Sequence, residues 1–84
     1  MVEERRKTER RRVLRRGKIV FRRGHSAIDC VVLDLSDGGA RLKAPGLIAL
    51  PEQFELRFEN GPSYEVALAF RTFETAGVRF LDAA

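Results

Sequence analysis

The sequence predicts a small all-β domain, a six-stranded antiparallel β-barrel. Apolar and polar residues alternate with a period of two over several short runs, as in strands with one buried face. Turn-forming residues separate these runs at intervals of about 8–12 residues, the spacing typical of sandwiches and barrels. No segment has the pattern of an amphipathic helix. A chain of 84 residues holds at most one domain, and closing the sheet into a barrel removes its exposed edges.

Residues rich in Gly, Asp, Asn, Ser and Pro mark the expected turns, at residues 23–25, 34–39 and 60–63. In the second of these turns we expect Asp34 and Ser36 to cap backbone donors, and Gly38 or Gly39 to adopt a positive φ. The expected strands cover residues 18–22, 28–33, 40–44 and 54–59, then a strand with Val66, Leu68 and Phe70 on one face, and a last strand with Val78 and Phe80 opposite Arg79.

Positive charge is concentrated near the N-terminus, although the whole chain carries a net charge of only +4. Residues 1–23 hold eleven basic and three acidic side chains, whereas residues 24–84 hold five basic and nine acidic ones. Because like charges repel, we expect residues 1–16 to form a basic arm, extended or mobile without ligand, and residues 17–84 to form the barrel. Such an arm predicts a polyanion, an anionic ligand or an acidic surface as partner.

Several classes of protein do not fit the residues present. Cys30 is the only cysteine, so an internal disulfide is excluded, and its apolar strand predicts a place in the core. No apolar run approaches the roughly 18 residues of a membrane span, and the charged N-terminus lacks the apolar region of a signal peptide. His25 stands alone, without the spacing of a zinc site or a nucleophile–base pair. We expect a cytoplasmic protein that is not an enzyme and has no metal or cofactor.

Arg6 and Arg10 form an R-x-x-x-R pair in the arm. The planar guanidinium fork matches a phosphate or the O6/N7 edge of guanine in a bidentate way. Taken alone, the pair also fits a solvated charge run or a nonspecific nucleic-acid tail. Two further registers exist, Arg11–Arg15 and Arg12–Arg16.

The segment from Asp34 to Gly39 reads D-x-S-x-x-G. A β-turn accounts for this pattern without any ligand. The functional interpretation is that the Asp34 carboxylate accepts from the N1–H and N2–H groups of guanine, while Ser36 bonds base or phosphate. Gly39 then lets a ligand lie close to the backbone.

The two motifs, in this order on an all-β background, resemble the PilZ domain family. Gly77-Val78-Arg79-Phe80 is similar to the last barrel strand of that family, and the resemblance extends from about Glu4 to Leu81. The chain looks most like the short single-domain members of alphaproteobacteria. It departs from the family in having Phe70 where many members carry Trp, and in leaving room for little or no C-terminal helix before Ala84.

The resemblance implies a six-stranded barrel and binding of the bacterial second messenger cyclic di-GMP. By this resemblance Arg6 and Arg10 clasp phosphate and guanine, while Asp34, Ser36 and Gly39 hold the guanine and the backbone side of the ligand. Arg5, which precedes the pair, is associated in the family with an intercalated ligand dimer. We prefer the Arg6–Arg10 register because Glu4 and Arg5 precede it, as in the family.

Three functions follow as hypotheses. The first is a cyclic di-GMP receptor or adaptor that orders its arm on binding and passes the change to a downstream protein, which the sequence does not name. The second is a small nucleic-acid-binding protein that uses the basic arm, with a steep salt dependence of affinity. The third is a PilZ-like barrel that acts through protein contacts alone.

Overall fold

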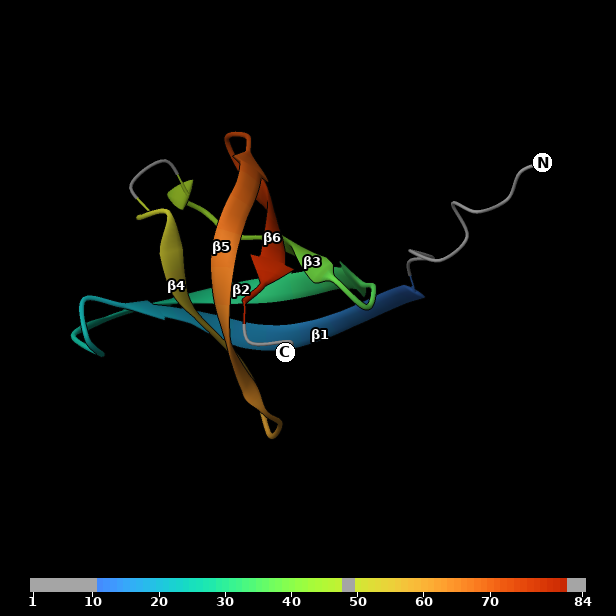
Figure 1. Ribbon diagram of the computed structural model, residues 1–84, viewed down its shortest axis with the longest axis horizontal. Helices are drawn as coiled ribbons and strands as arrows, with labels where there is room; N and C mark the ends of the chain where they lie inside the picture. Colours follow the sequence, from blue (N-terminus) through green and yellow to red (C-terminus); the bar gives the residue numbers. More distant parts are fainter. Residues whose placement is uncertain (1–10, 48–49, 82–84) are drawn as a thin grey trace.

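Six antiparallel strands close into a barrel in the computed structural model, which describes residues 11–47 and 50–81 (Figure 1). Around the barrel the strands follow the order β1-β2-β3-β6-β5-β4. The predicted six-stranded antiparallel β-barrel is confirmed, and the described residues contain no α-helix. The strands are β1 (Arg11–Phe21), β2 (Ser26–Leu35), β3 (Gly39–Lys43), β4 (Gln53–Phe58), β5 (Ser63–Arg71) and β6 (Thr75–Phe80).

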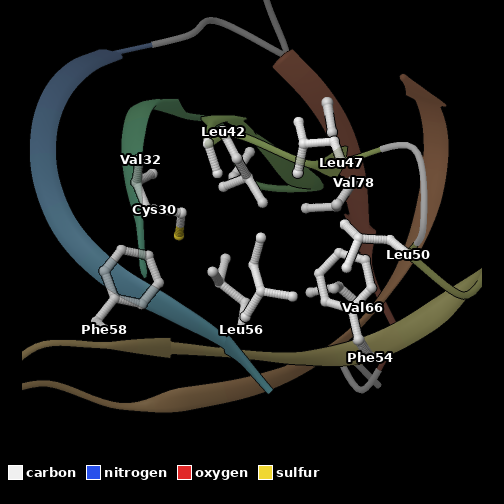
Figure 2. Close-up of a cluster of buried hydrophobic side chains, with 14 residues drawn as sticks. Cys30, Val32, Leu42, Leu47, Leu50, Phe54, Leu56, Phe58, Val66 and Val78 are labelled. Carbon is white, nitrogen blue, oxygen red and sulfur yellow. The ribbon is translucent and has the colours of Figure 1, made fainter. Parts of the chain in front are cut away.

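A single apolar core fills the barrel. In β3 the inward residues Ala40 and Leu42 alternate with the exposed residues Arg41 and Lys43, as the period of two predicts. Figure 2 shows side chains from β2, β3, β4, β5 and β6 pointing toward one another inside the barrel. Full burial of one Leu or Ile contributes about 1.5–3 kcal/mol, so these side chains are the main source of stability. Cys30 belongs to the core, as predicted.

The first strand begins at Arg11, earlier than the alternation in the sequence indicates. Residues 11–16, which we expected in the basic arm, belong to β1, and four of them pair with β2, for example Arg12 opposite Asp34 and Arg16 opposite Val31. Backbone pairing does not depend on side-chain charge, and β2 continues far enough, to Leu35, to supply the partners. The rest of the expected arm, including Arg5, Arg6 and Arg10, lies outside the described residues.

Two expectations are wrong, one about the face that Phe70 occupies and one about a turn at Asp34. Phe70 does not share the inner face with Val66, because the register between β5 and β6 shifts between Leu68 and Phe70, and its side chain is 47% exposed. Asp34 is not in a turn, because β2 extends through Leu35. In both places a bulge adds a residue to one strand, which changes the face that the following residues occupy.

Candidate functional site

A β-bulge at Leu33 decides where Asp34 lies. In the β2–β3 ladder Val32 pairs with Leu42, and the next pair is Asp34 with Arg41. Strict alternation after Cys30 and Val32 would direct Asp34 into the apolar core. Since Leu33 is left unpaired, Asp34 instead shares the outer face with Arg41. On the other side of β2, Leu33 faces two residues of β1, Val13 and Leu14, and Leu14 has a φ of 46°.

Asp34 is held by Arg41 on the neighbouring strand. Arg41 donates from Nε at 2.9 Å and from Nη2 at 2.7 Å, both to Oδ2 of Asp34. Asp34 is 6% exposed and is the only buried charged residue in the described part of the chain. Charge-assisted bonds of this length are the stronger class of hydrogen bond, so Arg41 orients a nearly buried carboxylate at the rim of the barrel.

Ser36 begins the connection between β2 and β3, and Gly39 is the first residue of β3. The Ser36 amide donates to the Gly39 carbonyl at 2.9 Å, and the Ser36 hydroxyl donates to the same oxygen at 3.4 Å. The Phe80 amide of β6 donates to the Gly38 carbonyl at 2.9 Å. The expectation that Ser36 caps a backbone donor is therefore wrong, since its hydroxyl bonds an acceptor.

Gly39 is required by close packing and not by its backbone angle. Neither Gly38 nor Gly39 has a positive φ, contrary to expectation. A Cβ added to Gly39 would lie 2.0 Å from the Val78 carbonyl oxygen, whereas one added to Gly38 would meet nothing within 4 Å. Gly39 thus lets β3 approach β6 at the point where the D-x-S-x-x-G segment ends.

A row of directly paired residues crosses the outer face of the barrel from β1 to β5. Its members, in order around the barrel, are Arg12, Asp34, Arg41, Gly77 and Phe70. A Cβ on Gly77 would lie 2.2 Å from Cε2 of Phe70, so the Phe70 ring lies directly on this glycine. Neighbouring strands are about 4.8 Å apart, so the row places a carboxylate, two guanidinium groups and an aromatic ring on one continuous surface.

A cavity of about 430 Å³ opens beside this surface, at the mouth of the barrel, and we call it the mouth cavity. Arg11, Arg15 and Ser36 line it together with three aromatic rings, those of Phe58, Tyr64 and Phe80. The Tyr64 ring lies 6.0 Å from Phe58 and 4.9 Å from Phe80, and the Arg15 guanidinium lies 5.3 Å from the Phe58 ring centre. The mouth cavity therefore combines two arginines and one acidic residue, Asp37, with an aromatic floor.

The structure brings together part of the predicted site. Asp34, Ser36 and Gly39 lie along one continuous segment from the end of β2 to the start of β3. Arg5, Arg6 and Arg10 lie outside the described residues. The sequence analysis missed Arg41, because nothing in the alternation of residues 40–44 shows that it pairs with Asp34. It also missed that Arg11 and Arg15 line the mouth cavity, whereas Arg12 pairs with Asp34 on the outer face.

Three further observations concern metal ligands, the thiol and membrane-spanning helices in the described residues. Across residues 11–47 and 50–81, no three His, Cys, Asp or Glu side chains gather as metal ligands would. Burial raises the pKa of the Cys30 thiol to about 11, which makes it a poor nucleophile. None of the described segments is a helix long and apolar enough to cross a bilayer.

The structure is thus a closed six-stranded barrel that carries a polar surface at one rim. The chain belongs to the PilZ domain family, whose model matches residues 4–83, nearly the whole chain. PilZ domains are binding and adaptor domains, and the family is known for binding cyclic di-GMP. No curated protein matches the sequence.

Proposed function

We propose that this protein is a bacterial, cytoplasmic receptor for cyclic di-GMP, in which Asp34, Ser36 and Gly39 form the fixed half of the site. Arg5, Arg6 and Arg10 supply the other half. The observation that carries the proposal is the bulge at Leu33, which places the Asp34 carboxylate on the outer face beside Arg41. A bulge that re-aims one carboxylate at the end of a strand is typical of binding sites.

Chain connectivity supports the joining of the two halves. Arg11 pairs with Leu35, the residue between Asp34 and Ser36. Consecutive Cα atoms are about 3.8 Å apart, so the peptide that leads from Arg11 to Arg10 starts next to the D-x-S-x-x-G segment. A ligand held there would thus lie beside the point where the segment that carries Arg6 and Arg10 joins β1.

The chemistry of the ligand matches these groups. Cyclic di-GMP is a dianion with two guanines, and the ionised Asp34 carboxylate accepts from the N1–H and N2–H groups of one guanine. Arginine forks bind its phosphates or the O6/N7 edge of guanine. Arg5 adds a cation for a second, intercalated ligand molecule. The protein performs no catalytic step in this proposal.

Binding is expected to order the arm, which gives the signal read by a downstream protein. Ordering costs about 1–2 kcal/mol of backbone entropy per residue, and each hydrogen bond to a charged group returns about 1.5–3 kcal/mol. Several arginine contacts are thus needed to offset the cost, which explains why both motifs are required together.

Titration calorimetry with cyclic di-GMP tests the proposal. We expect wild type to bind, Arg6→Ala/Arg10→Ala to lose binding, and Asp34→Ala to weaken it strongly. Arg22→Gly/Arg23→Gly, in the exposed β1–β2 turn, removes the same charge away from the site and is the matched control. Absence of binding by wild type contradicts the proposal. Tight, salt-sensitive binding of nucleic acid that survives Asp34→Ala favours the nucleic-acid function instead.

A further inference from the structure

The first part of β1 has one open edge. β1 pairs with β2 from Arg11 to Phe21, apart from a register shift between Arg12 and Arg15, but with β4 it pairs only from Gly17 to Val20. The last backbone contact on that side is the Glu59 amide donating to the Arg16 carbonyl at 3.0 Å. Within the described ranges no strand covers the β4 side of Arg11–Arg15. In Figure 1 the blue ribbon of β1 runs outward past β3 and β6 to its start at Arg11.

This edge is strongly cationic. Arg11 and Arg15 line the mouth cavity on one face of the strand, while Arg12 and Arg16 pair with Asp34 and Val31 on the other face. None of the ion pairs among residues 11–47 and 50–81 uses any of these arginines. An open edge is a template for another strand. Pairing of this edge with its copy on a second molecule would bring two sets of arginines together, so their charges oppose self-association.

We infer that the open edge of β1 binds an extended acidic segment of a partner protein by strand addition. Side chains of an added strand alternate between the two faces of the sheet, so acidic residues on both faces meet Arg11 and Arg15 on one side and Arg12 and Arg16 on the other. A nucleic acid that lies along one face would contact only one of these pairs. The placement of the arginines therefore favours a strand.

The mouth cavity adds specificity to this edge. Its volume of about 430 Å³ and its floor of Phe58, Tyr64 and Phe80 suit one aromatic side chain of the added segment. Arg11 and Arg15 line the same cavity, together with Asp37. The expected partner segment thus has acidic residues on both faces and one aromatic residue near its centre. This inference does not depend on binding of cyclic di-GMP.

The test is an NMR titration of the full chain, isotope-labelled and free of cyclic di-GMP. The probe is the synthetic peptide Thr-Glu-Glu-Thr-Phe-Glu-Glu-Thr. We expect slower amide exchange within Arg11–Arg15 and shift changes at Tyr64 and Phe80. The matched peptide is N-methylated at alternate residues, which keeps its charge and removes half of its amide donors. Since one hydrogen bond contributes about 0.5–1.5 kcal/mol, loss of two of them should weaken binding by a factor of about 5 to 150.

Arginine variants distinguish strand addition from nonspecific electrostatic attraction between the basic protein and the acidic peptide. Arg11→Ala/Arg15→Ala and Arg12→Ala/Arg16→Ala should each weaken peptide binding by a similar factor, whereas Arg22→Gly/Arg23→Gly should leave it nearly unchanged. Equal binding of the N-methylated peptide overturns the inference, and so does an equal loss in the Arg22→Gly/Arg23→Gly control. A single-stranded DNA oligonucleotide that binds more tightly than the peptide, without slowing amide exchange, also overturns it.

Discussion

Arg41 donates two hydrogen bonds to one carboxylate oxygen of Asp34, at 2.9 and 2.7 Å, across the ladder between β2 and β3. This ion pair lies on the outer face at the rim of the barrel, and its carboxylate is nearly buried. It joins the D-x-S-x-x-G segment to Arg41, a residue outside that segment, so substitution of Arg41 tests both stability and the proposed binding.

Arg41→Ala should lower the free energy of unfolding by about 1–3 kcal/mol, because it removes two charge-assisted bonds from a buried carboxylate. It should also weaken cyclic di-GMP binding, because Asp34 loses its orientation. Arg41→Lys should recover part of the stability but less of the binding, since an ammonium group does not reproduce the guanidinium fork. Urea unfolding and calorimetry measure the two effects; unchanged values for Arg41→Ala contradict the role assigned to the ion pair.

Gly39→Ala should destabilise the barrel by about 1–3 kcal/mol, the range for overpacking. The added Cβ would clash with the Val78 carbonyl oxygen, and a backbone atom cannot rotate away. Gly38→Ala is the matched control, because its Cβ meets nothing within 4 Å and its φ is not positive. Thermal unfolding should show a loss for Gly39→Ala and a change within about 0.5 kcal/mol for Gly38→Ala. Equal effects at the two positions would show that the close approach of β3 to β6 does not cause the destabilisation by Gly39→Ala.

Phe70 and Gly77 should be energetically coupled. Gly77→Ala is expected to destabilise the protein because its Cβ would enter the Phe70 ring, 2.2 Å from Cε2. In the Phe70→Ala background the same substitution should cost much less, because the obstructing ring is gone. A double-mutant cycle from urea unfolding should give a coupling of about 0.5–3 kcal/mol. Additive effects contradict the packing of the ring on the glycine.

Cys30 should be unreactive in the folded protein, and its titration should make the protein less stable at alkaline pH. Burial raises the pKa of its thiol from 9.0 to about 11. Above about pH 9 the unfolded thiol loses its proton before the folded one, so the stability contributed by the neutral buried thiol falls as pH rises from about 9 through about 11.

This alkaline loss should be smaller in Cys30→Ala, as measured by unfolding at pH 8 and at pH 10. At neutral pH a thiol reagent should modify wild-type Cys30 only after urea is added. Rapid modification of the native protein would mean that the thiol is not enclosed by the core.

Much of the fold could be predicted because its physical causes are local. Alternation in residues 40–44 placed Leu42 inside and Arg41 outside, since side chains of a strand alternate between two faces. Turn residues separated the expected strands near their observed ends. The D-x-S-x-x-G pattern located Asp34, Ser36 and Gly39 in one segment, and the family match over residues 4–83 confirms the resemblance on which their roles rest. Those roles remain predictions.

By itself, the sequence determined the class of fold, most of the core and the family, because period, turn chemistry and motif order are properties of neighbouring residues. Tertiary structure alone decided that Leu33 is left out of the ladder and Asp34 faces outward, that Phe70 lies on Gly77, and that Arg11–Arg16 belong to β1. These outcomes depend on register between strands distant in sequence, and a shift of one residue moves a side chain to the opposite face. The Asp34–Arg41 pair exists only because that register places both residues on the same face.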